Sequence, residues 1–319
     1  MTAPATDRRI RDLRGPKPHV DPWKAHGTLL EDERRPGGAI ERALTIFLAG
    51  CECPFTCSFC DLWRYTIDGP TPSGALPRQI AEALRSVEKP PAARLKLYNA
   101  SNFFDRRAVP AGDVPDIAAL TAPFAGVTVE SHANTVGPLT LEFANQIPGR
   151  LEVAVGLETI HPVASAHLNK RLELARFDRA ARFLAENDID LRVFVLLGAP
   201  YVPDDESVAW TVRTAEYAAQ RGASVVSIIP VRRGNGEIER LEELGHFTPP
   251  TLSQLEQSLD WCIVGAGESG AVVFTADLWD VDRLPACSDC RAQRVDRLRR
   301  LNVTGVAERS VSCNRCGAG

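Results

Sequence analysis

Apolar and polar residues occur along the chain in blocks, and six of these blocks are short, nearly continuous apolar runs. Runs of this length, bounded by turn residues, are typical of strands that are buried on both faces of a sheet. The sequence therefore predicts six core strands. They lie at residues 43–49, 94–100, 126–131, 151–158, 190–198 and 223–230.

Helical patterns fill the intervals between these runs, with apolar residues at spacings of three and four. Strands that alternate with helices indicate right-handed βαβ units and a parallel sheet. In such a sheet the catalytic and ligand-binding residues lie on the loops at the carboxyl ends of the strands. We expect the helices at residues 76–87, 114–124, 138–147, 177–187 and 206–222.

The pattern divides the chain into four stretches. A polar extension at residues 1–40 is expected to pack loosely over the main body, which is the alternating region at residues 41–250. Residues 251–286, with a helix-like segment and a strand-like run at 272–280, are expected to pack on that body. Residues 287–319 carry four of the nine cysteines and are expected to form a small metal-binding module.

Composition limits the classes of protein to which the chain can belong. With 319 residues, 44% of them hydrophobic, the chain is long enough to bury a large core. Its formal net charge of −4 argues against a general nucleic-acid binder. The sequence has neither a secretory leader nor an apolar span of membrane length, so we expect a cytoplasmic protein whose cysteines are reduced.

Three cysteines directly after the first predicted core strand suggest a metal centre. Cys53, Cys57 and Cys60 are spaced C-x3-C-x2-C, and Cys51 is an additional thiol just upstream. Structural zinc sites usually combine paired C-x2-C knuckles and need four ligands, so this set fits zinc poorly. Three thiolates on one loop can bind three irons of a [4Fe–4S] cluster and leave the fourth iron open. We favour the cluster, with zinc or uncoordinated core cysteines as alternatives.

This triad, with Phe59 before its last thiol, resembles the cluster motif of the radical S-adenosylmethionine (radical SAM) enzymes, and the likeness covers roughly residues 43–235. The resemblance implies a partial (β/α)6 barrel of parallel strands in which S-adenosylmethionine chelates the open iron. It also implies an electron donor such as flavodoxin or ferredoxin. One electron then cleaves the cofactor to a 5′-deoxyadenosyl radical, which abstracts hydrogen from a substrate.

Polar residues at the next strand ends extend the resemblance. The second strand ends in a turn with Asn99 and Ser101, whose oxygens can accept hydrogen bonds from the amino group of the cofactor; a plain turn is the alternative. The third and fourth strands end in Glu130 and Glu158. Lys170 follows twelve residues after Glu158, where the resemblance implies a basic residue against the cofactor carboxylate. For the glutamates a salt bridge within the barrel is the alternative, and for Lys170 a solvated helix start.

Apolar and glycine-bearing turns end the last two strands, at Gly198, Pro200 and Pro230. The resemblance implies that backbone of this kind lies against the adenine ring of the cofactor. No residue is assigned as a catalytic acid or base, because the radical does the difficult chemistry. The candidates for the substrate side are Tyr98, Asn102 and Asp105.

Four further cysteines lie near the end of the chain. They form two C-x2-C pairs separated by 22 residues, which is a strong signal of metal binding. Thiolate coordination suits zinc and a second iron–sulfur cluster alike, and the spacing does not choose between them. The arginine-rich segment 291–302 predicts a helix with a solvated face, with phosphate binding as the alternative. The four cysteines are Cys287, Cys290, Cys313 and Cys316.

Two functional hypotheses follow. Within the superfamily the turns look most like those of the radical SAM subunit of archaeosine synthase, which acts as a lyase on a modified tRNA base. The main hypothesis is therefore a radical SAM enzyme that acts on a nucleoside, a tRNA base or a natural-product precursor, with a nucleic-acid substrate left open. The alternative is a non-enzymatic, zinc-stabilised RNA-binding or regulatory module, in which the thiols only shape loops.

Overall fold

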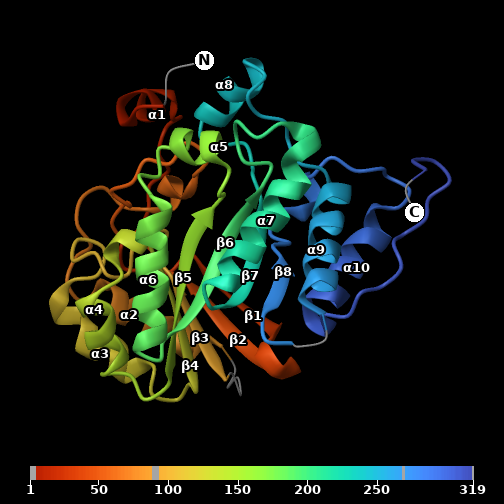
Figure 1. Ribbon diagram of the computed structural model, residues 1–319. Coiled ribbons are helices and arrows are strands. Elements are labelled where there is room, and N and C mark those ends of the chain that lie inside the picture. Colours follow the sequence, from red (N-terminus) through yellow and green to blue (C-terminus); the bar gives the residue numbers. More distant parts are fainter. Residues whose placement is uncertain (1–4, 88–92, 268–269, 318–319) are drawn as a thin grey trace.

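The computed structural model describes residues 5–87, 93–267 and 270–317, and its centre is one eight-stranded sheet. The strands follow one another in chain order; β1 is antiparallel to β2, and all later neighbours are parallel. The sheet curls into a half-barrel with helices on its outer face (Figure 1). The strands are β1 (Gly27–Arg34), β2 (Ile40–Phe47), β3 (Arg94–Tyr98), β4 (Gly126–Ser131), β5 (Arg150–Glu158), β6 (Asp190–Leu197), β7 (Ala223–Pro230) and β8 (Val273–Ala276).

Helices connect the parallel strands and flank the sheet, and none of those in the described ranges is long and apolar enough to cross a membrane. The α-helices are α1 (Asp7–Leu13), α2 (Ala75–Ser86), α3 (Val114–Leu120), α4 (Pro138–Ala144), α5 (Pro162–His167), α6 (Leu174–Glu186), α7 (Ser207–Gln220), α8 (Glu237–Glu243), α9 (Leu252–Ala266) and α10 (Arg291–Thr304). Short 3₁₀ turns lie at Pro36–Gly38, Leu62–Tyr65, Ala111–Asp113, Ala133–Thr135, Asp204–Glu206 and Val281–Arg283.

The six predicted strands are β2 to β7, so the predicted α/β partial barrel is confirmed. The strand-like run near residue 272 provides β8, which pairs with β7. The sequence did not predict β1. The expectation that residues 1–40 pack loosely is wrong for Gly27–Arg34, because this segment pairs with β2 along its whole length.

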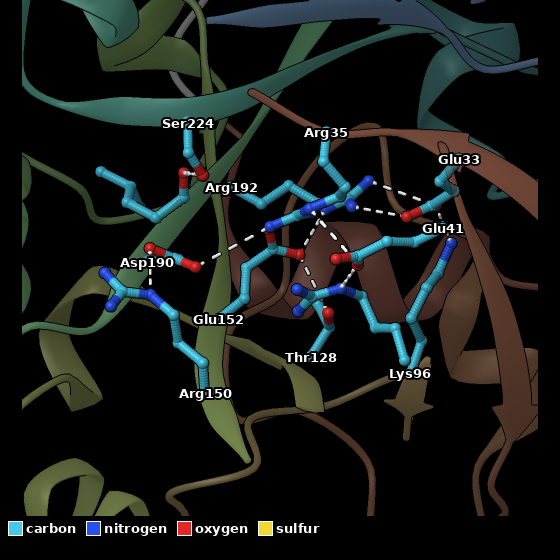
Figure 2. Close-up of polar contacts among 12 residues, drawn as sticks. Glu33, Arg35, Glu41, Lys96, Thr128, Arg150, Glu152, Asp190, Arg192 and Ser224 are labelled. Atoms are coloured by element: carbon cyan, nitrogen blue, oxygen red, sulfur yellow. Dashed lines mark hydrogen bonds and ion pairs between the residues drawn. The ribbon is translucent and has the colours of Figure 1, made fainter. Parts of the chain in front are cut away.

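Charged side chains line the inner face of the half-barrel, and they explain why β1 escaped prediction (Figure 2). Glu152 on β5 is fully buried and accepts hydrogen bonds from Arg35 Nη1 at 2.7 Å and Arg192 Nε at 2.9 Å. Glu33 on β1 accepts from Arg192 Nη2 at 2.8 Å and also pairs with Lys96. Because β1 turns its polar residues toward this network, it lacks the apolar pattern by which strands are recognised.

Helix α10, which includes the whole of the predicted helix 291–302, contacts both edge strands of the sheet, β1 and β8. Asn302 donates from Nδ2 to the Ala276 carbonyl and accepts at Oδ1 from the Ala276 N–H, both at 2.8 Å. At the end of the helix, Gly305 lies so close to Arg34 that a Cβ would overlap the guanidinium. The division of the chain into four stretches stays a prediction.

Candidate active site

Cys53, Cys57 and Cys60 lie on the loop that follows β2, at the carboxyl end of the parallel sheet. Cys57 is buried, and the other two are half-buried. Ionisation of Cys57 or Cys53 would raise the pKa of Cys60. They do not converge on one point: among the described residues, only the C-terminal cysteines form such a group. This arrangement suits ligands of separate irons better than ligands of one shared ion.

Asn102, from the turn after β3, contacts one of these thiols directly. Its Nδ2 lies 3.3 Å from the Sγ atom of Cys53, and its Oδ1 accepts from the backbone N–H of His132 at 2.7 Å. Both ends of the buried amide are therefore engaged. Asn102 ties the cysteine loop to the ends of β3 and β4, which makes it a positioning residue for Cys53.

Two loops from later strands hold the remainder of the cysteine loop. The Ser58 N–H donates to the Leu168 carbonyl at 2.9 Å, and Asn169 Nδ2 donates to the Thr56 carbonyl at 2.6 Å. Asn235, which is buried, donates from its amide to the Ser58 carbonyl. The loop is thus fixed by one backbone carbonyl and two side chains that lie more than a hundred residues away in the sequence.

The thiols of this loop are in an environment that keeps them protonated. Burial raises the pKa of all three, to about 12 for Cys57. The Lys170 ammonium acts in the opposite direction on Cys53 and Cys57. Thiols with raised pKa values stay protonated at neutral pH unless a metal displaces the protons. The donor set therefore fits a metal site better than a free nucleophile.

The turn after β3 contains polar groups that have no partner. Asn99 is 1% exposed, and neither the oxygen nor the nitrogen of its side-chain amide has a hydrogen-bond partner among the described residues. The same holds for the hydroxyl of Ser101. The N–H groups of Ala100 and Asn99 in this turn favour the ionised form of Glu130 and so oppose the rise in its pKa. Because buried polar groups nearly always have partners, these atoms indicate a ligand position beside the cysteine loop.

Glu158 and Lys170 form an ion pair at the end of β5. Lys170 Nζ donates to Glu158 Oε1 at 2.8 Å, and both side chains are largely buried. Burial alone would lower the pKa of Lys170, but the Glu158 carboxylate raises it above its usual value, so the side chain is charged. Gly156 makes the arrangement possible, because a Cβ there would lie 2.0 Å from Glu158 Oε1 and 2.8 Å from Lys170 Nζ. The pair also matches the salt bridge that the sequence left as the alternative for Glu158.

Comparisons with known proteins identify the fold. No family model matches the chain. Archaeosine synthase subunit beta of Methanosarcina acetivorans is 22% identical over 278 residues, which covers 84% of this chain and 80% of that protein. A radical SAM methyltransferase from Sphaerobacter thermophilus has a TM-score of 0.51 at 14% identity, over 79% of this chain and 73% of that one. The chain has the radical SAM fold.

Two longer proteins are also similar in structure. SuiB of Streptococcus suis, solved with its precursor peptide SuiA, has a TM-score of 0.53 at 11% identity, over 73% of this chain and 48% of that one. Elp3 of Methanocaldococcus infernus has a TM-score of 0.51 at 10% identity, over 70% of this chain and 57% of that one. The chain therefore spans about half the length of these two structures.

Two titratable groups near the mouth of the radical SAM barrel have shifted pKa values. Burial and the Lys170 ammonium lower the pKa of His132 to about 3. Its Nδ1 accepts from the Asn134 N–H at 3.1 Å, so Nε2 carries the proton and donates to the Lys170 carbonyl. His132 is thus a neutral, structural residue. Burial raises the pKa of Glu130 to about 7, although the Ala100 N–H opposes the shift.

Phe59 lies within the cysteine loop, and Asp105 lies in the segment that follows β3. The ammonium of Lys170 is 6.0 Å from the centre of the Phe59 ring. Asp105 Oδ1 accepts from the Arg107 N–H at 2.9 Å, within its own turn. Phe59 is therefore near the proposed cofactor residues, whereas Asp105 is engaged in local structure.

Tyr98 lies inside the half-barrel, next to Lys96 of the charged network. Its ring contacts the rings of Phe47 and Phe194, at centroid distances of 6.5 and 6.4 Å. Burial raises its pKa to about 12, so the phenol is neutral. Tyr98 is half-buried at the end of β3, in the part of the radical SAM fold that faces the barrel interior.

The glycine and prolines at the ends of β6 and β7 are buried. Gly198 has φ +74°, and a Cβ there would meet the Pro250 ring at 2.9 Å. This residue must therefore be glycine for reasons of backbone conformation and packing, whatever else it contacts. Pro200 and Pro230 are also buried, close to it in the fold.

Several residues that shape the site were not selected from the sequence. Gly156 and Asn235 carry no signal of their own, because their partners become neighbours only in the folded chain. Arg14, the residue directly after α1, contacts the cysteine loop: its Nη1 donates to Glu52 Oε1 at 2.6 Å. Asp7, at the start of α1, accepts from Asn169 Nδ2 at 2.8 Å. The polar composition of this extension concealed its contacts with the site.

Proposed function

We propose that the protein is a radical SAM enzyme that binds a [4Fe–4S] cluster on Cys53, Cys57 and Cys60. When bound, such a cluster supplies the electron that breaks the sulfonium C–S bond of S-adenosylmethionine, and the resulting 5′-deoxyadenosyl radical takes hydrogen from a substrate. The observation that carries the proposal is the pairing of three non-converging thiols with the unpartnered, buried atoms of Asn99 and Ser101.

The chain offers suitable groups for the amino acid part of the cofactor. Asn99 Oδ1 and Ser101 Oγ are unpartnered acceptors, and an ammonium group has three N–H donors. Lys170 uses one of its own donors on Glu158 and keeps two for a carboxylate. We propose that Lys170 binds the cofactor carboxylate and that Glu158 and Gly156 position it.

The roles of the other predicted cofactor residues follow from their contacts. The N–H groups of Ala100 and Asn99 favour the ionised form of Glu130. We therefore propose that Glu130 positions the turn that carries Asn99 rather than contacting the cofactor. We propose that Phe59, beside Lys170, screens the ion pair from water. Gly198, Pro200 and Pro230 remain proposed contacts of the adenine ring, because they lie at the ends of β6 and β7.

For the substrate we propose a nucleoside or a tRNA base, with a natural-product precursor as the alternative. The support is the distant likeness to archaeosine synthase subunit beta. Of the three candidates on the substrate side, Tyr98 fits best because it lies inside the half-barrel with no side-chain hydrogen bond described. Asn102 and Asp105 both have engaged side chains. A flavodoxin or ferredoxin is the proposed electron donor.

A direct experiment compares two cysteine variants after anaerobic reconstitution with iron and sulfide. Cys57→Ala should lose the iron of the first site and all reductant-dependent release of 5′-deoxyadenosine. Cys262→Ala is the matched control, because Cys262 is equally buried but lies on α9. It should retain both iron and cleavage. Cleavage by folded Cys57→Ala would refute the ligand assignment.

The alternative, a non-enzymatic zinc-stabilised module, makes a different prediction. Its folded protein would be colourless, would contain zinc alone, and would release no 5′-deoxyadenosine. It gives no role to the unpartnered Asn99 amide.

A further inference from the structure

The four C-terminal cysteines lie on both sides of helix α10 and meet at one point. Cys287 and Cys290 precede the helix, and Cys313 and Cys316 follow it. All four Sγ atoms lie within 4.8 Å of one another. Two contacts cross between the pairs, at 4.0 Å from Cys287 to Cys313 and at 3.8 Å from Cys290 to Cys316.

These distances discriminate between the two kinds of metal centre. Four thiolates around one zinc ion, with bonds of 2.3 Å in a tetrahedron, would have sulfurs about 3.8 Å apart. In a [4Fe–4S] cluster each thiolate binds a different iron, so the width of the cluster separates the sulfurs further. The observed spacing leaves room for one ion and not for a cluster.

We propose that Cys287, Cys290, Cys313 and Cys316 bind a single zinc ion, and that this ion locks helix α10 against the two edges of the half-barrel. Zinc is favoured over a single ferrous ion, because divalent-metal affinity for a given site rises from iron to zinc.

A buried arginine beside the thiols suits a metal site with a negative net charge. Four thiolates and one zinc ion carry a net charge of −2. Arg294 is 5% exposed, and its Nε donates to Cys290 Sγ at 3.1 Å. The same guanidinium donates to the Val311 carbonyl at 3.2 Å and pairs with Glu256 on α9. Arg294 is therefore a positioning residue that links a ligand, the segment after α10 and the neighbouring helix.

The position of α10 gives the ion a structural role. The helix contacts β1 and β8, which are the two edges of the sheet. Asn302 occupies the hydrogen-bonding groups of Ala276 on β8 much as a ninth strand would. Leu298 and Leu301 of the same helix are fully buried in the core. An ion that joins the segments before and after α10 therefore holds this helix in place against β1 and β8.

The ion can be identified by counting metals in the wild-type protein after anaerobic reconstitution. We expect one zinc per chain in addition to the iron of the first site. A second set of about four irons would overturn the proposal, and so would a single extra iron without zinc or an empty C-terminal site. The Cys57→Ala variant should keep its zinc, so failure of this proposal is separable from failure of the proposed function.

A pair of variants at Cys316, the exposed ligand, tests the coordination. Cys316→His should retain one zinc, because three cysteines and one histidine are a common structural zinc set. Cys316→Ala should lose most of its zinc on dialysis against a chelator. Equal zinc retention by both variants would show that Cys316 is not a ligand.

Hydrogen exchange tests whether the zinc ion holds helix α10 against the edges of the half-barrel. Zinc-depleted Cys316→Ala should exchange faster in α10 and β8 than Cys316→His, while β3 to β6 keep their protection. Chelator-treated wild type should repeat this pattern if the alanine variant does not fold. Unchanged protection in α10 after loss of zinc would overturn the structural role.

Discussion

The two cysteine regions of this protein use the same side chain in different ways. At the C-terminus four thiols lie within 4.8 Å of one another, beside the guanidinium of Arg294, and every ligand position of one ion is filled by protein. On the loop after β2, three thiols do not form such a group, and the neighbouring turn contains polar atoms that have no hydrogen-bond partner among the described residues.

This difference provides a criterion that distinguishes a structural cysteine site from a reactive one. Four thiolates fill every coordination position of one metal ion, and such a site adds stability to the fold. Three thiolates on a cluster leave one iron open, and this iron and the nearby polar groups can bind a small molecule. The unpartnered amide of Asn99 is therefore as informative as the cysteine spacing, because a structural site would not leave it buried and unsatisfied.

The largest effect is expected when each site is removed in turn. Cys57→Ala should lose iron and keep zinc, whereas Cys313→Ala should lose zinc and keep iron. Elemental analysis of both variants, purified and reconstituted in parallel, measures this. If either substitution removed both metals from folded protein, the two sites would not be independent.

Gly156→Ala should disable the cofactor site without removing the cluster ligands. The new Cβ would overlap the Glu158 carboxylate and displace the Lys170 ammonium. We expect the KM for S-adenosylmethionine to rise at least about tenfold, at an overpacking cost of about 1–3 kcal/mol in stability. Gly112→Ala, at an open position, is the control. An unchanged KM with iron retained would mean that the ion pair does not face the cofactor.

Asn99→Ala and Asn102→Ala should separate binding from stability. Asn99 makes no side-chain hydrogen bond to the residues that the structure describes, so its removal should change the unfolding free energy by less than about 0.5 kcal/mol while weakening cofactor binding. Asn102→Ala leaves the buried His132 N–H without a partner and should cost about 1–3 kcal/mol. Denaturant unfolding and equilibrium binding of S-adenosylmethionine provide the two readouts. A loss of stability in Asn99→Ala would argue that its amide has a structural partner.

The smallest effect concerns Glu130 and pH. Its pKa in the folded protein, about 7, lies above the ordinary value of 4.5, so the folded state binds this proton more tightly than the unfolded chain. Stability should therefore fall as pH rises from about 4.5 to 7, by about 1 kcal/mol after allowance for partial exposure. Glu130→Gln should remove this part of the pH dependence. An identical dependence of stability on pH in the variant would show that folding does not raise the pKa of Glu130.

Much of the fold was accessible from the sequence because β2 to β7 keep apolar faces against the helices. Their runs and the intervening amphipathic segments sufficed to predict an α/β partial barrel. β1 was missed because Glu31 and Glu33 turn toward Lys96 inside the half-barrel, so the face that β1 packs against the barrel interior is polar and only partly buried. Periodicity detects apolar burial and not burial of paired charges.

The sequence predicts the cysteine ligands of the site better than the residues that hold these ligands in position. Cysteine spacing is local, and the pairing of Glu158 with Lys170 spans only twelve residues. The contacts of Asn235 and Asn169 with the cysteine loop cross more than a hundred residues and leave no pattern in the sequence. The choice of metal at the C-terminal cysteines also needed distances, because zinc and cluster sites share the C-x2-C spacing.

We propose that, of the two cysteine sites, only the first offers an open iron to a small molecule. Electron paramagnetic resonance of the reduced, iron-loaded protein, recorded with and without S-adenosylmethionine, tests this proposal. We predict the signal of a single [4Fe–4S] cluster per chain whose g values shift when S-adenosylmethionine is added. A cluster signal that does not respond to S-adenosylmethionine, in folded protein with its full iron content, would contradict the account.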